Sequence, residues 1–221
     1  MHSAVVDRLK EGRPMLEHVP HWLGGLMRNM RAGADKLVIL QPRLRVAEHS
    51  LQLTSPAFAD GARLPVRFTA DGEGVSPPLV WTDPPEGTAG YCLIVEDADA
   101  PAPNPLVHAV VWGIPAGERR LEEGAIVSDG RGGPDGRDVG RNSFLGEGWL
   151  PPDPPSGHGT HDYAFQLFAL SELPDLDANP GRGDVAEAMS GRVLAAGLLI
   201  GTYSRGEERP SGQAGLAGAP A

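Results

Sequence analysis

The stretch Tyr91–Pro115, YCLIVEDADAPAPNPLVHAVVWGIP, decides the fold of this chain. It contains two apolar segments, 91–96 and 106–114, which are rich in valine, isoleucine and aromatic residues. A link with several prolines and two aspartates, 97–105, joins them. Short apolar segments bounded by turn residues predict β-strands, so we expect two strands connected by an irregular loop. Long irregular segments in a compact domain are typically functional or disordered, which draws attention to this link.

The rest of the middle of the chain has the same texture. Further strands are expected at Leu51–Thr54, Leu64–Thr69, Tyr163–Leu170 and Gly197–Tyr203, and a helix at Asp184–Ala195. The 221 residues include 30 glycines and 22 prolines, which argues against a helical bundle and excludes a long coiled coil. The composition therefore predicts a mainly β protein, either a β-sandwich or a barrel.

The two ends of the chain differ from this middle part. Residues 1–45 carry eight Lys/Arg and four Asp/Glu, and apolar residues recur there at steps of three and four, which predicts a helical N-terminal arm. These apolar residues are Leu23, Leu26, Met27, Met30, Ala34 and Leu37. We expect the arm to dock on the main body or on a second subunit; the alternative is a basic helix on a membrane surface. Residues 206–221 are rich in Gly, Ala, Pro and Ser and predict a disordered tail after a domain at 46–205.

Charge and cysteine content exclude several classes of function. The net charge is −10, and residues 46–221 hold 11 arginines against 25 acidic residues, a balance that repels nucleic acid. A single cysteine, Cys92, permits neither an intramolecular disulfide nor a zinc-type cysteine cluster. No apolar run is long enough for a transmembrane helix, and Asp7 and Arg8 interrupt any secretory h-region. These features favour a cytoplasmic protein.

Two segments bring together residue types that a binding site needs. Asp97 and Asp99 follow directly on an apolar strand, and His108 lies within the next one. Farther along, the sequence PPDPPSGHGTHDY places His161 and Tyr163 two residues apart at the start of a strand, and hence on one face. Each of these residues alone is more typical of a structural role. The two segments together favour a site formed by carboxylates, imidazoles and a phenol.

Motifs in this order resemble the phosphatidylethanolamine-binding protein family, and more closely its bacterial branch. The resemblance covers about residues 50–205. The matching motifs are GEGVSPPLVW (72–81), DADAP (97–101), HAVVWGIP (108–115), GRNSFLGEGW (140–149), PPSGHGTHDYAFQLFAL (154–170) and RVLAAGLLIGTYSR (192–205). Several ordered motifs are far more specific than any one of them alone.

The resemblance implies an antiparallel β-sandwich with a helix near the C-terminus and a small anion pocket at one end. It implies that the ligand is phosphate or a phosphorylated headgroup such as phosphoethanolamine. Carried over to this chain, the lining residues are Asp97, Asp99, His108, His161 and Tyr163, with Pro101 after a cis bond, Pro155 and Gly157 in the rim loop 154–157, and Trp81 and Trp149 near the mouth.

The chemistry of these residues suits a ligand of mixed charge. Carboxylates beside the histidines are expected to raise the histidine pKa, so that imidazolium groups donate to phosphoryl oxygens while the aspartates accept from an ammonium group. Phosphoryl binding should then weaken above about pH 7. Asp153 and Asp162 depart from the family pattern, which has a small residue and an arginine there, and they are expected to reduce the positive potential at the rim.

The leading interpretation is a small binding protein without catalytic activity or cofactor, a homodimer that can also regulate a protein partner such as a kinase or protease. The alternative is a hydrolase that uses Asp97, Asp99, His108 and His161 for a metal ion or for acid/base catalysis. The sequence lacks GxSxG, HExxH and the phosphate-binding GxxxxGK[ST], which weighs against a hydrolase. A third possibility is that the pocket is unused and the arm mediates assembly.

Overall fold

Alternation of side chains along one fully buried strand organises the fold. The structure is a computed structural model that describes residues 32–44, 51–128, 137–177 and 179–206. In strand β4 (Gly90–Asp97), Tyr91, Leu93 and Val95 face one hydrophobic cluster, whereas Cys92 and Ile94 face another. A strand buried on both faces reads as a continuous apolar run, as this one does.

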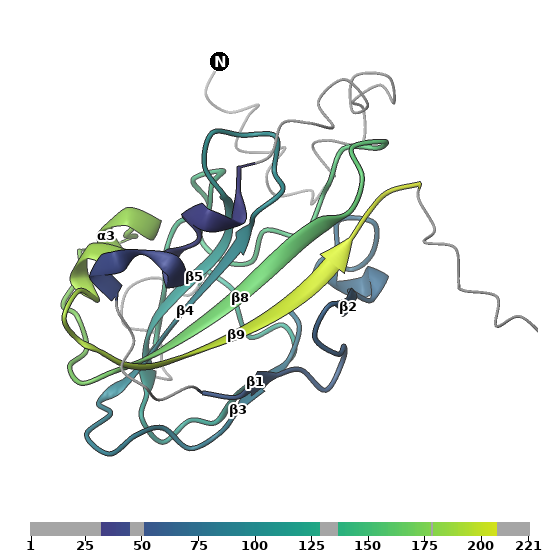
Figure 1. Cartoon of the computed structure of the whole chain (residues 1–221). Helices are drawn as coiled ribbons and strands as arrows, with labels where there is room; N and C mark the ends of the chain where they lie inside the picture. Colours follow the sequence, from purple (N-terminus) through teal and green to yellow (C-terminus); the bar gives the residue numbers. More distant parts are fainter. Residues whose placement is uncertain (1–31, 45–50, 129–136, 178, 207–221) are drawn as a thin grey trace, which may run out of the picture.

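Two sheets lie on either side of the first cluster (Figure 1). The larger sheet has the order β2-β9-β8-β4-β5-β7, and the smaller has the order β1-β3-β6. The remaining strands of the larger sheet are β2 (Ala62–Arg63), β5 (Leu106–Pro115), β7 (Asp138–Val139), β8 (His161–Leu170) and β9 (Val193–Tyr203). Those of the smaller sheet are β1 (Leu53–Thr54), β3 (Leu79–Trp81) and β6 (Arg120–Leu121).

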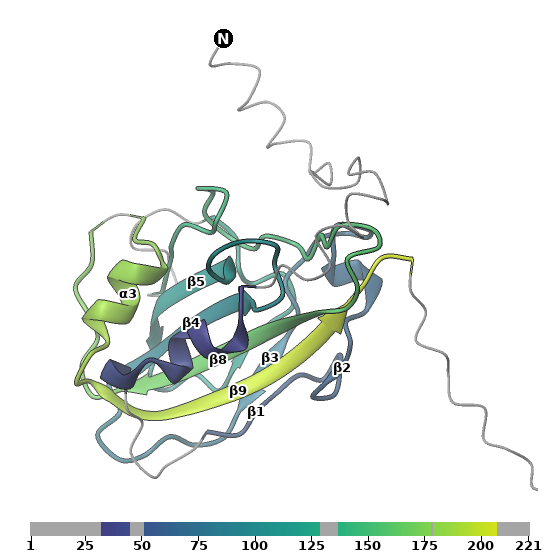
Figure 2. The same ribbon diagram turned by 45° about the horizontal axis from the view of Figure 1, so that its top comes forward.

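Helical segments cover the other face of the larger sheet (Figures 1 and 2). They are α3 (Arg182–Ala188) and three 3-10 helices, η1 (Ala34–Lys36), η2 (Val38–Leu40) and η3 (Pro42–Leu44). Their buried residues form the second cluster with the outward-facing residues of β4, β5 and β8. We call residues 32–44 the N-terminal strap.

The mainly β architecture is confirmed, but the larger sheet is mixed. Strand β2 runs parallel to β9, whereas the other strand pairs are antiparallel. The strands expected from 91, 106, 163 and 197 onward are present as β4, β5, β8 and β9, and β1 covers part of 51–54. The strand expected at 64–69 is wrong, because Pro65 precedes a 3-10 helix, η4 (Val66–Phe68), whose first carbonyl accepts the Thr69 hydroxyl.

The helical segments also differ from the expectation. Helix α3 ends well before residue 195, because the chain turns at Gly191 with a φ of 74° and enters β9 at Val193. The described part of the arm consists of short 3-10 turns after Gly33, whose φ is 96°, and not of a continuous helix. The apolar positions from Leu23 to Met30 and the expected tail at 207–221 lie outside the described residues. In the part that is described, no helix combines the length and apolar character that a membrane crossing requires.

Gly197 of β9 packs closely against the backbone of Leu51, and this contact can be tested. A Cβ atom at this position would lie 2.7 Å from the Leu51 carbonyl oxygen, which is backbone and cannot turn away. We expect Gly197→Ala to lower the free energy of unfolding by about 1–3 kcal/mol. Gly117→Ala, where a Cβ would meet nothing within 4 Å, is the matched control and should leave stability nearly unchanged. Equal urea midpoints for the two variants would contradict this packing.

Candidate functional site

At the end of β4, the buried carboxylate of Asp97 lies beside His161, at the start of the neighbouring strand β8. Asp97 continues the inward alternation of Val95 and pairs in register with Tyr163 of β8. The Asp97 Oδ2 atom accepts a hydrogen bond from Nδ1 of His161 at 2.7 Å, and Oδ1 accepts the backbone N–H of Asp99 at 2.8 Å. His161 is 1% exposed and Asp97 5%, so this contact is shielded from water.

A second histidine extends this contact. Nδ1 of His158 lies 2.6 Å from Nε2 of His161, and the ring centroids are 4.7 Å apart. Asp97, His161 and His158 therefore form one hydrogen-bonded chain, in which the facing nitrogens of the two imidazoles share one proton. His158 is not among the residues proposed from the sequence. The spacing of its histidines, H-x-x-H across a turn at Gly159 with a φ of 107°, is the signal that could have revealed it.

His108 reaches the same region from β5 because of a β-bulge. Val95 pairs with Ala109 and Glu96 with Val107, so His108 is the extra residue between them. Its Nδ1 lies 2.6 Å from the Leu150 carbonyl oxygen and must donate to it, since a carbonyl only accepts. Burial lowers the pKa of His108, although the charge of Asp97 and the bond to Leu150 oppose the shift. At pH 7 and above, His108 is therefore a neutral imidazole, and the expectation of a raised pKa at this residue is wrong.

Tyr163 lies between the two histidines. Its ring meets His108 edge-on at 5.1 Å and stacks with His161 at 6.4 Å. Burial, together with nearby carboxylates of which Asp97 contributes most, raises the pKa of Tyr163 well above its usual value, so the phenol keeps its proton. Neither the Tyr163 hydroxyl nor Nε2 of His108 has a hydrogen-bond partner within the described residues. A buried donor and a buried acceptor thus stand on adjacent rings.

The segment 150–158, here the proline loop, is attached to three parts of this cluster. Leu150 makes two hydrogen bonds with His108. Its carbonyl oxygen accepts from the His108 ring, as described above, and its backbone N–H donates to the His108 carbonyl oxygen at 2.8 Å. Asp153 forms an ion pair with Arg205, and His158 contacts His161. Pro155 and Gly157 are both buried in this loop, and Gly157 has a φ of 80° that favours glycine.

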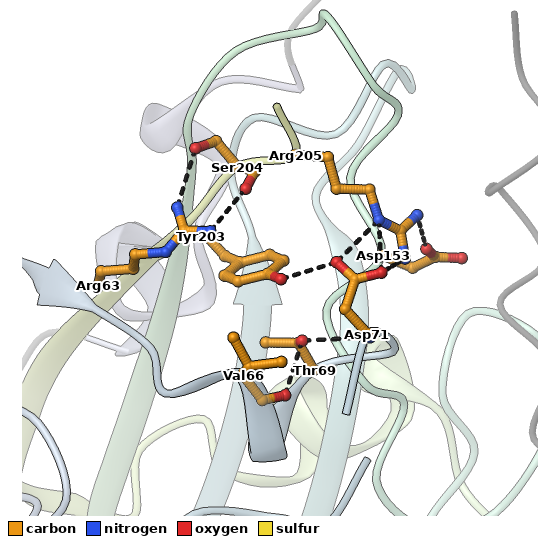
Figure 3. A network of polar contacts seen from close by, with 8 residues as sticks. All are labelled: Arg63, Val66, Thr69, Asp71, Asp153, Tyr203, Ser204 and Arg205. Atoms are coloured by element: carbon orange, nitrogen blue, oxygen red, sulfur yellow. Dashed lines mark hydrogen bonds and ion pairs between the residues drawn. The ribbon is translucent and has the colours of Figure 1, made fainter. Parts of the chain in front are cut away.

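A polar network at the end of β9 supplies the cation that contacts the loop (Figure 3). Arg205 binds Asp71 with two nitrogens, Nε at 2.9 Å and Nη2 at 2.6 Å, and also pairs with Asp153. The Tyr203 hydroxyl donates to Asp71 at 2.7 Å. Burial alone would raise the pKa of Asp71, but hydrogen bonds from Arg205 and Tyr203 and the charges of Arg205 and Arg63 lower it overall. This arginine was not proposed from the sequence.

The two acids that depart from the family pattern have different surroundings. Asp153 forms an ion pair with Arg205, but Arg205 also binds Asp71, so one guanidinium group serves two carboxylates. Asp162 is exposed and alternates to the face opposite His161 and Tyr163. Its backbone N–H donates to Oδ2 of Asp99 at 2.7 Å, so Asp99 is bonded to the start of β8 in addition to lying near Tyr163.

Three further candidates are placed as follows. No peptide bond in the described residues is cis, so the expected cis bond before Pro101 is wrong; the chain turns there through a bond from Ala102 N–H to the Ala100 oxygen at 2.7 Å. The Trp149 ring lies 6.1 Å from His108 and stacks on Phe165. Trp81 packs against Tyr91 at the opposite end of β4 and is not brought together with the other residues.

The geometry offers little to a metal ion. Among the described residues, no group of three or more His, Cys, Asp or Glu side chains is arranged to hold one. Both nitrogens of His161 and one nitrogen of His108 are already engaged in hydrogen bonds. The arrangement favours hydrogen bonding to a small polar group over metal coordination.

The lowered pKa of His108 predicts a pH dependence of stability. The unfolded chain takes up a proton near the ordinary value of 6.5, whereas the folded chain resists it until a lower pH. The stabilisation is complete well above pH 6.5 and is lost progressively as the pH falls below this value toward the lower pKa of the folded state. We expect His108→Asn, which keeps a donor near Leu150 but cannot titrate, to show a shallower loss of melting temperature between pH 7 and 5, each protein being referred to its own value at pH 8. An unchanged slope would contradict a neutral buried His108.

The sequence profile of the family described as "Phosphatidylethanolamine-binding protein" matches residues 54–204. A "UPF0098 protein" of Methanothermobacter thermautotrophicus is 42% identical over 156 residues, covering 71% of this chain and all of that protein. A "UPF0098 protein" of Aquifex aeolicus is 40% identical over 158 residues, covering 70% of this chain and 89% of that protein.

A solved structure shows the same relation. The crystal structure of YbcL from Escherichia coli, described as a member of the mammalian PEBP family, aligns with a TM-score of 0.66 at 30% identity and covers 71% of this chain and 99% of YbcL. The matched residues include the end of β4, the bulge of β5, the proline loop and the start of β8. On this evidence the chain belongs to the phosphatidylethanolamine-binding protein family.

Proposed function

We propose that this chain is a binding protein whose His108, Tyr163 and surrounding residues take a small phosphoryl group that carries one proton, as in phosphate or a phosphoethanolamine-like headgroup. The observation that carries the proposal is the juxtaposition of two buried, unpartnered groups within the described residues, Nε2 of His108 and the hydroxyl of Tyr163. Unsatisfied buried polar groups in native proteins call for an explanation, and ligand binding is one that fits this family.

The protonation states of the two groups select the ligand chemistry. Nε2 of neutral His108 can only accept, and the Tyr163 hydroxyl donates, so a fitting group must offer one O–H and one acceptor oxygen side by side. A monoprotonated phosphoryl group has this pattern and a second pKa of about 6. A fully ionised phosphoryl group lacks the O–H and would leave Nε2 of His108 unpaired.

The surrounding charges also disfavour a dianion. The pKa of Tyr163 reports a negative environment. It is raised by the charges of Asp97, Asp99 and Asp153, and among the strongest charge effects only that of Arg205 lowers it. Arg205 is already engaged with Asp71 and Asp153. A zwitterion, whose ammonium group lies toward the carboxylates, is therefore better matched than a bare dianion.

Burial limits the size of the bound group. His108 is 2% exposed and Tyr163 0%, so only a small group can reach them, and the rest of a larger ligand must remain outside. The proline loop, with Pro155 and Gly157, is the proposed rim, and Trp149 lies next to His108 on the side of Phe165. The half-buried Asp99 is the carboxylate proposed for the ammonium group.

Calorimetric titration with phosphoethanolamine and with inorganic phosphate at pH 6 and pH 8 tests this function. We expect binding to be several-fold tighter at pH 6, because the ligand then carries its proton. Tyr163→Phe removes the donor alone and should weaken binding about tenfold or more, the usual cost of a hydrogen bond to a charged group.

The matched control is Tyr91→Phe, which removes a phenol at the opposite end of β4, where it contacts Arg119 at 2.8 Å. It should bind the ligands as the unaltered chain does. No heat of binding from either ligand at pH 6, or equal affinities for the two phenylalanine variants, would overturn the proposal.

A further inference from the structure

The N-terminal strap lies outside the part of the chain that the family profile matches, yet family-domain residues hold it along most of its length. The match begins at residue 54, whereas the strap comprises residues 32–44. Val38 and Leu44 are fully buried against the outer face of the larger sheet, and Leu37 packs on Ala98 and Ala164. Figures 1 and 2 show the strap crossing this face beside α3.

A buried polar cluster holds the middle of the strap. Glu96, which is 0% exposed, accepts the backbone N–H of Val38 at 2.9 Å and the Gln166 amide at 2.8 Å, and it pairs with Arg182. The Gln166 oxygen accepts the N–H of Ile39 at 2.8 Å. Arg182 also donates to the Lys36 carbonyl. The Glu96 carboxylate and the Gln166 amide oxygen thus each accept a backbone N–H of the strap. Without the strap, both buried groups would lose a hydrogen-bond partner.

The beginning of the strap is bonded to the aspartate loop, residues 97–103, which leads away from the proposed ligand site. Ala32 N–H donates to the Ala100 carbonyl at 3.0 Å, and Gly33 N–H donates to the Ala98 carbonyl at 2.9 Å. Lys36 Nζ donates to the Pro103 carbonyl at 2.8 Å. Three carbonyls of the loop that carries Asp97 and Asp99 are therefore fixed from outside the family domain.

Glu96 and Asp97 are consecutive residues of one strand and point to opposite faces of the sheet. Glu96 contacts the strap, whereas Asp97 contacts His161. We infer that the N-terminal strap is a positioning element of the ligand site: its contacts on the outer face of the sheet set the geometry of the aspartate loop, whose first residue, Asp97, points to the inner face. The consequence for ligand affinity rests on the function proposed above, whereas the coupling to the loop does not.

A charge placed in the seat tests the coupling in the full-length chain. Val38→Asp puts a carboxylate beside buried Glu96, whereas Leu40→Asp makes a similar change two residues away, where the side chain is 58% exposed. We expect hydrogen exchange of the amides of Ala98, Asp99, Ala100 and Ala102 to become about fivefold faster or more in Val38→Asp and to stay unchanged in Leu40→Asp. Amides of β5 serve as the internal reference.

If Val38→Asp speeds exchange in the strap but leaves residues 98–102 as slow as in the unaltered chain, the coupling is refuted. If the β5 amides also exchange faster, Val38→Asp destabilises the fold beyond the strap, and Lys36→Ala becomes the deciding variant. That variant removes the bond to Pro103 alone and should speed exchange only in the aspartate loop; no change there refutes the coupling as well.

Phosphoethanolamine titration of the same variants separates this inference from the proposed function. Weaker binding by Val38→Asp than by Leu40→Asp supports a positioning role for the strap. Absence of binding by the unaltered chain overturns the proposed function, and the exchange experiment still tests the coupling.

Discussion

Two buried carboxylates at the end of β4, Glu96 and Asp97, constrain the rest of the structure. An ionised carboxylate without partners in a protein interior costs several kcal/mol, so each of these groups requires fixed donors. Because adjacent strand residues point to opposite faces, one set of donors must lie outside the sheet and the other inside. The outer set comes from the strap, α3 and β8, and the inner set from His161 and the aspartate loop.

The hydrogen bonds on the inner face explain why this site is not simply a positively charged anion pocket. Asp97 accepts from His161, and the other ring nitrogen of His161 is bonded to His158, so neither nitrogen of His161 is available to a ligand without rearrangement. His108 and Tyr163 are held by packing and by the Leu150 carbonyl in states that leave one acceptor and one donor. The proposed selectivity for a protonated phosphoryl group therefore follows from burial and hydrogen bonding, without any net positive charge.

Much of the inner layer could be predicted from the sequence because its signals are local. Apolar runs predict β4, β5, β8 and β9, and the i, i+2 spacing of His161 and Tyr163 places both on one face. The motifs predict which segments meet. The pKa of His108 could not be foreseen, because it depends on how deeply the bulge buries the ring.

Other features could not be predicted from the sequence, because they depend on contacts between residues far apart in the chain. Arg205 acquires its role through Asp71, 134 positions away, and the strap is held by Glu96 and Gln166 from distant strands. The helical periodicity expected up to residue 37 ignores these partners, which fix short 3-10 turns on the sheet. Trp81 and Trp149 look equivalent in sequence, but only the Trp149 ring lies near His108, whereas Trp81 packs against Tyr91.

The most direct test of the account is a long-range ¹H–¹⁵N NMR measurement of the histidine rings of the full chain, with and without phosphoethanolamine at pH 6.5. The account predicts that His108 is neutral and protonated at Nδ1, and that its Nε2 resonance moves toward that of a hydrogen-bonded nitrogen when the ligand is added. A doubly protonated His108 in the free protein, or an Nε2 resonance that ignores saturating ligand, would contradict it.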